Sequence, residues 1–293
     1  MKYFGLLVCL ILLIGCEKDI NIQPEVQEPL LVVDGMIENN QPPMIILSKS
    51  LNYFSTFNTD LLQNSLVKNA KVTLNNGIKT VSLREYTVSV GGVFSFNYYT
   101  TDSNNLAAKM VGQIGKTYLL TIDFDGKRYE AKTVIPVSKK SLDSIWWKLA
   151  PKNEDTMKVV LMGKFTDPAG YGDYVRYFTK VNSGPYLPGV NSVFDDNVID
   201  GTTYDFQIDQ GVNRNDFPEQ KDYGYFLRGD TTTVKFCKID KGSFDFWRTL
   251  EFSYQSTGNP FSTPTKVMSN VSNGALGAFC GYSVQLRTLI VPK

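Results

Sequence analysis

The sequence contains no histidine among its 293 residues. This absence excludes Ser-His-Asp and Cys-His nucleophile systems, acid–base catalysis by histidine and every metal site with a histidine ligand. A pair of carboxylates needs no histidine, so carboxylate-based hydrolysis stays open as an alternative. We predict a protein that is not an enzyme and that holds no metal and no cofactor.

The chain also has no excess of acidic or of basic residues. The chain has 30 basic and 29 acidic residues, and without Lys2, which lies in the predicted leader, 29 of each remain. No basic stripe alternates with aromatic residues, and no glycine-rich loop opens a helix. These absences exclude a typical nucleic-acid partner and a typical phosphate-binding loop.

The apolar run at the start, MKYFGLLVCLILLIGC, is too short to span a membrane, because a spanning helix needs about 20 apolar residues. It has the charged and apolar regions of a signal peptide. The end of the run, Leu13-Ile14-Gly15-Cys16, resembles the lipobox of bacterial lipoproteins. That resemblance implies that the Cys16 thiol receives a diacylglycerol, that the signal is cut before Cys16 and that the new amino terminus is acylated. The alternative is an ordinary signal peptide with a chance cysteine.

The residues after Cys16 indicate where the anchor is sent. Glu17-Lys18-Asp19 resembles the signal that Bacteroidota place after the lipidated cysteine to export a lipoprotein to the outer face of the outer membrane. Ile20 stands where a second acidic residue is expected, so an inward-facing orientation stays open. We predict an outer-membrane, lipid-anchored and surface-facing protein. The polar segment up to Pro29 is expected to be a tether.

Short runs rich in β-branched and aromatic residues fill most of the chain after the tether. Residues 118–136 are the clearest example, because apolar residues alternate on both sides of Asp125-Gly126, a pair that suits a type I′ hairpin turn. Residues 240–255 break this alternation: Phe244, Trp247, Leu250 and Tyr254 recur at helical spacing, and Asp240 or Ser243 can cap the first turn. We expect the aromatic stripe of this helix to face a sheet.

The predicted fold class is mainly β, with an N-terminal immunoglobulin-like β-sandwich followed by a second β-rich domain with one helix. The predicted divisions are a signal peptide (1–15), a lipidated tether (16–29), a β-sandwich domain (30–137) and a second β-rich domain (138–293) with its helix near 241–255.

Cys237 and Cys280 are the cysteines left after Cys16 and the leader. They are a candidate disulfide if their segments are neighbouring strands, and two buried free thiols are the alternative. The run Asp195-Asp196-Asn197 and the nearby Asp200 gather several carboxylates, which either form a solvated acidic loop, as we favour, or bind calcium.

Three tripeptides match the acceptor pattern of Bacteroidota O-glycosylation. The hydroxyls concerned belong to Ser144, Thr156 and Thr231, each directly after an aspartate. A hydroxyl that carries a glycan must face solvent, so a buried side chain at any of these positions would exclude it.

Several longer segments together resemble one family. They include LVVDGMIENNQPPMIILSKSLNYF, GKTYLLTIDFDGKRYEAKTVIP, FTDPAGYGDYVRYF and DKGSFDFWRTLEFSYQSTGNPFSTPTKVMSNVSNGALGAFCGY. The family is the Bacteroidota lipoproteins catalogued as domain of unknown function 4249, whose members are typically encoded beside TonB-dependent receptors.

The resemblance implies a non-enzymatic accessory or binding partner of a TonB-dependent receptor barrel, with an unknown small-molecule or glycan ligand. A stand-alone adhesin or glycan-binding lipoprotein is the second hypothesis, with Trp146 or Trp147 and Tyr171 or Tyr174 making the contacts. A solvent-facing aromatic row would favour this second hypothesis.

Overall fold

The structure is a computed structural model. It describes residues 28–52, 55–56, 58–92, 94–137, 141–151, 155–197, 200–216, 218–219, 221–257, 261–263 and 265–293. The predicted signal peptide, Cys16 and nearly all of the tether lie outside these residues. Strands dominate the described chain, which confirms the predicted mainly β class. None of the described helices is long and apolar enough to cross a membrane.

The elements of the first half alternate strands with short helical pieces. They are β1 (Leu31–Glu38), β2 (Met44–Lys49), α2 (Thr59–Ser65), β3 (Lys71–Asn75), β4 (Thr80–Ser82), β5 (Arg84–Val90), β6 (Phe94–Thr100), the 3₁₀ turn η1 (Leu106–Ala108), β7 (Thr117–Phe124) and β8 (Lys127–Val134). The second half contains β9 (Ser141–Leu149), β10 (Lys158–Thr166), β11 (Tyr174–Val181), β12 (Leu187–Phe194), β13 (Thr203–Ile208), β14 (Phe226–Leu227), β15 (Thr231–Ile239), α3 (Lys241–Ser256) and β16 (Leu276–Ile290).

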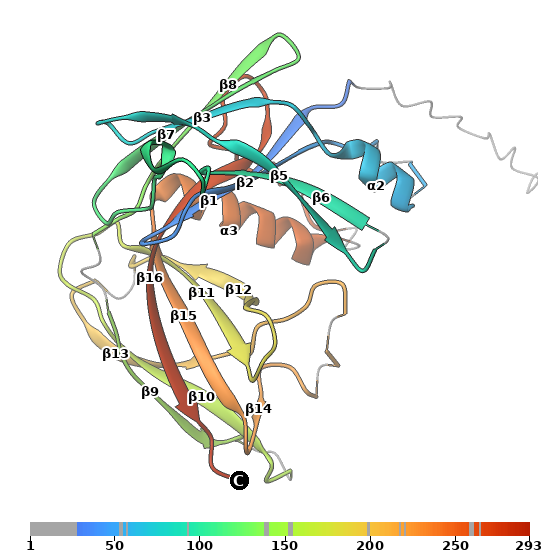
Figure 1. The fold of residues 1–293 in the computed structure, drawn as a ribbon. Helices are drawn as coiled ribbons and strands as arrows, with labels where there is room; N and C mark the ends of the chain where they lie inside the picture. Colours follow the sequence, from blue (N-terminus) through green and yellow to red (C-terminus); the bar gives the residue numbers. More distant parts are fainter. Residues whose placement is uncertain are drawn as a thin grey trace, which may run out of the picture.

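One eight-stranded sheet runs through both halves in the order β12-β11-β15-β16-β1-β2-β6-β5. Its central strand, β16, is 15 residues long and changes partner along its length. Residues 276–282 pair in parallel with β1, and residues 283–290 pair antiparallel with β15. The two halves of the molecule therefore share a strand, which Figure 1 shows in dark red from the upper half to the lower.

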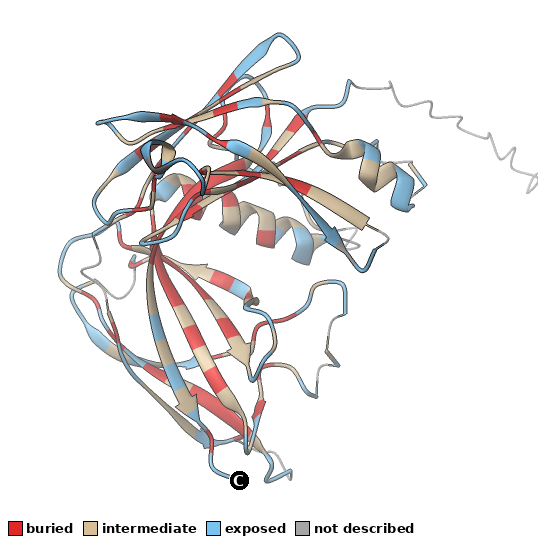
Figure 2. Ribbon diagram, viewed as in Figure 1, coloured by how far each residue is buried: buried red, intermediate tan, exposed pale blue. Residues whose placement is uncertain are grey.

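Two four-stranded sheets cover this long sheet and make two sandwiches. The sheet β4-β3-β7-β8 packs on the β1-β2-β6 region, and the sheet formed by β9, β10, β13 and β14 packs on β11, β15 and the end of β16. We call these the N-terminal and C-terminal sandwiches. Figure 2 shows the buried residues concentrated along the strands that face each other in these layers. The predicted division at 137/138 lies beside residues outside the described chain and stays a prediction.

Helix α3 covers the other face of the long sheet, where β11, β15 and β16 meet. Asp240 is its N-cap, as the sequence predicted, and its carboxylate accepts a hydrogen bond from Ser243 N. Phe244 is buried and Trp247 and Leu250 pack on the same cluster, whereas Tyr254 is exposed. The aromatic stripe therefore faces the sheet along most of the helix but not at its last turn.

The predicted hairpin at Asp125-Gly126 is also confirmed. Strands β7 and β8 form a hairpin around Asp125 and Gly126, whose φ values of 52° and 69° are those of the predicted type I′ turn. Helix α2 was not predicted; its seven residues begin after Asn58, whose side chain accepts from Leu61 N at 2.7 Å.

Candidate functional site

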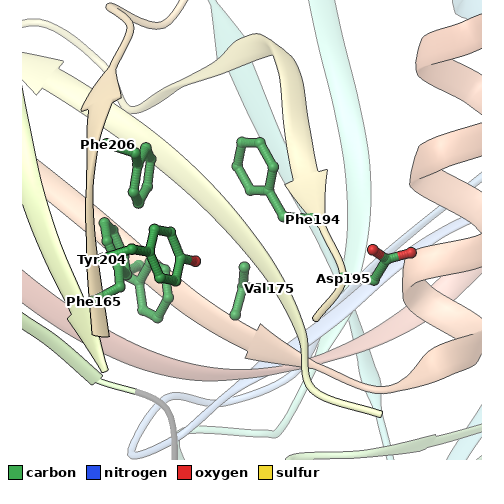
Figure 3. A pocket seen from close by; sticks show the side chains of 7 residues that line it. Phe165, Val175, Phe194, Asp195, Tyr204 and Phe206 are labelled. Carbon is green, nitrogen blue, oxygen red and sulfur yellow. The ribbon is translucent and has the colours of Figure 1, made fainter. Parts of the chain in front are cut away.

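An aromatic pocket lies at the open edge of the C-terminal sandwich. Its volume is about 200 Å³, and Figure 3 shows aromatic side chains from both sheets around it, with the Asp195 side chain turned away from them toward the helix. The lining residues are Phe165, Val175, Phe194, Asp195, Tyr204, Phe206 and Phe236. Ring centroids lie 4.0 Å apart for Phe165 and Phe206 and 5.0 Å apart for Phe165 and Phe236. These distances are typical of packed aromatic pairs.

The topology explains why the pocket is open on one side. β12 and β13 are edge strands of the two facing sheets, and they supply the half-buried walls Phe194, Tyr204 and Phe206. The strands behind them supply the buried floor, which includes Phe165 and Phe236. Among the described residues no further strand pairs outside these two edges, and the rings of the walls are partly exposed to solvent.

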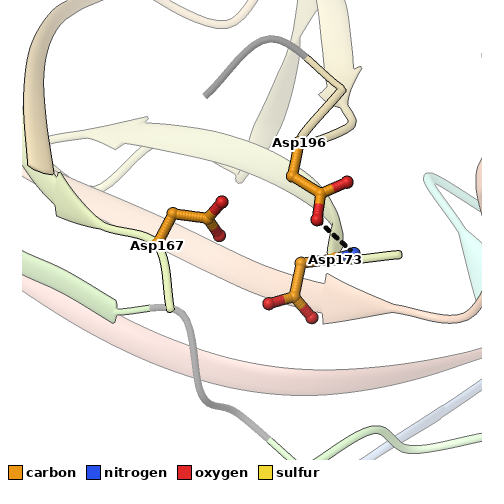
Figure 4. Close-up of side chains that lie close together, drawn as sticks. All are labelled: Asp167, Asp173 and Asp196. Atoms are coloured by element: carbon orange, nitrogen blue, oxygen red, sulfur yellow. Dashed lines mark hydrogen bonds between the residues drawn. The ribbon is translucent and has the colours of Figure 1, made fainter. Parts of the chain in front are cut away.

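A charged layer follows directly beyond the pocket. Phe165, Val175, Phe194 and Phe236 each have a charged residue two positions before or after them in the chain. One of these charged residues lies on β15, where residues two apart share a face, and the other three lie one or two residues beyond the ends of β10, β11 and β12. The four charged residues are Asp167, Asp173, Asp196 and Lys238. All four are buried, and carboxylate oxygens of the three aspartates lie within 4.8 Å of one another. Figure 4 shows these three side chains close together. Lys238 forms an ion pair with Asp173 within this layer.

The same carboxylates hold two loops together. Asp196 accepts from the backbone N–H groups of Gly172 at 3.2 Å and Asp173 at 3.1 Å. Asp200 accepts from Gly170 N at 2.6 Å. Gly170 and Gly172 have φ values of +122° and +106°, a backbone conformation that glycine allows at low cost.

The prediction of a solvated acidic loop is wrong for Asp196, which is 1% exposed, because its carboxylate is used to bind these backbone groups. Calcium binding by this loop stays a prediction. Asp196 belongs to a group of three carboxylates that could hold a metal ion, and the ammonium of Lys238 pairs with Asp173 in the same group.

Electrostatics of the pocket follow from its burial and from the charged layer. Burial and, as the smaller cause, the charge of Asp167 together raise the pKa of Tyr204 to about 12. The Tyr204 side chain therefore stays a neutral phenol at neutral pH.

A family profile described as "Domain of unknown function (DUF4249)" matches residues 17–288. The chain belongs to this family. The match begins at the residue after Cys16 and covers both sandwiches, the pocket and the charged layer of this DUF4249 protein. The resemblance inferred from the segments quoted above is thus confirmed. No curated protein matches the chain.

The candidate disulfide of the DUF4249 chain is wrong in the structure, where Cys237 and Cys280 are free and buried. β15 and β16 are neighbours, as a disulfide requires, but their register places Cys237 opposite Val284 rather than Cys280. Cys280 instead lies beside Met36 of β1. Burial raises the pKa of Cys237 to about 12 and that of Cys280 to about 11, which keeps both thiols protonated and unreactive at neutral pH.

The candidate glycosylation sites remain sterically possible. Ser144 and Thr156 are exposed, and Thr231 is half-buried. No side chain among the three is buried, so none is excluded by the criterion of solvent access, and glycosylation stays a prediction. The lipidation site Cys16 lies outside the described residues.

The aromatic residues predicted to contact glycans lie in different parts of the structure. Trp147 packs against the C-terminal core under the guanidinium of Arg228, and Tyr174 packs on Phe244 at 4.7 Å. Trp146 is half-buried, whereas Tyr171 is 75% exposed on the loop before β11. These side chains do not form one surface row.

A different aromatic row, which the sequence analysis missed, lies on β5 and β6. Tyr86 and Tyr98 are cross-strand partners with stacked rings 5.8 Å apart, and Phe96 continues the row at 6.2 Å from Tyr98. All three are half-buried on the face opposite to the N-terminal core. Arg84 lies over the ring of Tyr86 and forms an ion pair with Asp102 at the end of the row.

Proposed function

We propose that this DUF4249 protein is a lipid-anchored, surface-facing lipoprotein of a bacterial outer membrane that acts as a non-enzymatic binding partner of a TonB-dependent receptor. One observation carries the proposal: the lipobox-like Leu13-Ile14-Gly15-Cys16 is followed by a polar segment that ends where the folded body begins, at Leu31. An anchor, a tether and a folded recognition body are the parts that such a partner needs.

The tether sets how far the body can lie from the membrane. About 12 extended residues at roughly 3.3 Å each allow a separation of up to about 40 Å. That reach is enough for the body to contact the loops of a neighbouring barrel rather than the lipid surface alone.

The body suits recognition because its frame is stiff and its loops are exposed. The shared strand β16 joins the two sandwiches through continuous backbone pairing. Exposed aromatic side chains such as Tyr171 and Phe261 lie on loops that this frame supports. Residues of this type are enriched at protein interfaces. The choice of a TonB-dependent receptor rests on the setting expected for the family, in which the lipoprotein is encoded beside such a receptor.

A crosslinked pull-down from detergent-solubilised outer membranes tests this proposal. The tagged protein is compared with its Cys16→Ser form, which lacks the thiol that would be lipidated. Stoichiometric recovery of one TonB-dependent barrel with the anchored form is the expected result. Recovery of the lipoprotein without any barrel would rule out the accessory role.

A second candidate function, glycan binding, is favoured by the aromatic row of Tyr86, Tyr98 and Phe96. Stacked, partly exposed rings beside a charged pair offer apolar faces and hydrogen-bonding groups together, which suits a sugar ring. The test is a glycan array with the Tyr98→Ala variant, with Tyr171→Ala as the control on a separate loop. Binding that survives Tyr98→Ala, or no binding by the unaltered protein, would exclude this surface as a glycan site.

A further inference from the structure

Strand β5 ends the long sheet at an open edge. It pairs with β6 over all seven of its residues, and no described strand pairs with its other side. In an antiparallel pair every second residue directs its N–H and C=O away from the partner strand, and among the described residues none bonds to these outer groups of β5. Thr87, Val88 and Ser89 are exposed. Such an edge is a template for a further strand.

The other edge strands of the described sheets carry protection that β5 lacks. β4 and β14 are only three and two residues long. The backbone of Ser272 bonds to β8, and that of Val212 bonds to β12. β9 and β13 present exposed charges at Lys148 and Asp205. Proteins use short strands, covering segments and charges to prevent pairing at an edge, so their absence from β5 indicates that this edge is meant to pair.

The sequence of β5 is complementary to itself. A twofold axis through Thr87, perpendicular to the sheet, brings a second β5 alongside in the antiparallel direction with Thr87 opposite Thr87. Tyr86 then lies opposite Val88, and Glu85 lies opposite Ser89. Directly opposite residues share a face of the sheet, so apolar residues meet apolar ones and polar residues meet polar ones.

The charges of β5 also permit this pairing. They belong to Arg84 and Glu85 at the start of the strand, and Arg84 already forms an ion pair with Asp102. In the antiparallel pair the two Glu85 residues are separated by about 13 Å along the strands, at roughly 3.3 Å per residue. No like charges therefore lie opposite each other, which would destabilise a strand pair.

We propose that β5 is a self-association edge, which pairs with β5 of a second copy of this chain and joins the two eight-stranded sheets into one. The aromatic row on β5 and β6 then continues into the second copy, because Tyr86 gains Val88 of that copy as its cross-strand neighbour. Since the contact consists of one strand pair, the dimer is weak, with a dissociation constant in the micromolar range. This inference does not depend on the lipid anchor, the receptor or glycan binding.

Cysteine crosslinking tests the register. Thr87→Cys in the Cys16→Ser mature chain places two thiols opposite each other with Cα atoms about 4.5 to 5.5 Å apart, which is within the range that a disulfide allows. Ser89→Cys is the control, because it is exposed on the same strand but its two copies would lie about 13 Å apart. The native Cys237 and Cys280 are buried.

Under mild oxidation, Thr87→Cys should give at least about tenfold more covalent dimer than Ser89→Cys, since only the first pair meets the geometry of a disulfide. Equal yields from the two variants, or no covalent dimer from Thr87→Cys, would overturn the proposal.

Sedimentation equilibrium measures the association itself. Thr87→Lys places two ammonium groups opposite each other at the twofold axis and should weaken the dimer at least about tenfold. Ser82→Lys adds the same charge to the exposed edge of β4 and should leave the dissociation constant unchanged. Both exposed substitutions should keep the urea midpoint of the unaltered chain. A chain that stays monomeric at millimolar concentration, or a dimer that Thr87→Lys does not weaken, would refute the assignment.

Discussion

Asp240 joins helix α3 to the N-terminal sandwich, and its removal is expected to be costly. One carboxylate oxygen accepts from Ser243 N at 2.8 Å and caps the helix. The other accepts from Thr133 Oγ1 at 2.7 Å and from Val134 N at 2.8 Å, at the end of β8. Thr133 Oγ1 in turn accepts from Gly281 N at 2.8 Å, so the chain of hydrogen bonds reaches the centre of β16.

The expected loss follows from these contacts. An N-cap contributes about 0.5 to 2 kcal/mol, and each hydrogen bond to a charged group contributes about 1.5 to 3 kcal/mol. Because Asp240 is partly exposed, we take the lower part of this range and expect Asp240→Ala to reduce the free energy of unfolding by about 3 to 5 kcal/mol. Asp240→Asn should cost less, about 2 kcal/mol, since one amide oxygen still accepts but the amide nitrogen cannot accept from a backbone N–H.

Asn58→Ala is the matched control, because Asn58 caps the short surface helix α2 and makes no bond to a second element in that role. It should cost about 1 kcal/mol. The free energies are measured by urea denaturation with linear extrapolation. A loss for Asp240→Ala that stays within about 1 kcal/mol of the loss for Asn58→Ala would refute the reasoning that Asp240 joins α3 to the N-terminal sandwich.

Three further outcomes follow from the packing. Gly281→Ala should destabilise the protein by about 1 to 3 kcal/mol in urea denaturation, because a Cβ there would lie 2.4 Å from the carbonyl oxygen of Val134. The control is Gly242→Ala in α3, where the nearest atom is 3.6 Å away, and it should be neutral or stabilising. Equal effects of the two substitutions would contradict this account. In the Cys16→Ser mature chain, a thiol reagent at pH 8 should react with neither Cys237 nor Cys280 in the native state and with both after denaturation, whereas no reaction after denaturation would indicate a disulfide. Tryptophan fluorescence reports on the second half of the chain, and hydrogen exchange can be followed in the β7–β8 hairpin of the first half. The two signals should give the same unfolding midpoint, because β16 belongs to both sandwiches. Two separated midpoints would argue against this coupling.

Short-range signals in the sequence predicted the elements that depend on neighbouring residues. The type I′ turn needs positive φ at two adjacent positions, and Asp125-Gly126 provides them. Helix α3 follows from its aromatic spacing and from the cap at Asp240. Tyr254 fits the same spacing yet is exposed, because the periodicity of a helix does not reveal how far the sheet beneath it extends.

Features that depend on pairing between strands far apart in the sequence could not be predicted. The parallel pairing of β1 with β16 joins residues more than 200 positions apart, and no local pattern specifies it. The same limit applies to the pocket. The pairs Phe165/Asp167 and Phe194/Asp196 are visible in the sequence, but only the sheet order brings them together. The sequence therefore predicts a solvated loop at Asp196, whereas this residue is buried against the backbone of a second loop.

The lipid anchor at Cys16 is the central claim on which the proposed location depends, and intact-mass spectrometry of the protein purified from membranes tests it most directly. The account predicts a chain that begins at Cys16 and carries the added mass of a diacylglycerol and an amino-terminal acyl chain. The Cys16→Ser form should lack this mass and leave the membrane fraction. A chain of unmodified mass, or one cut at another residue, would contradict the account.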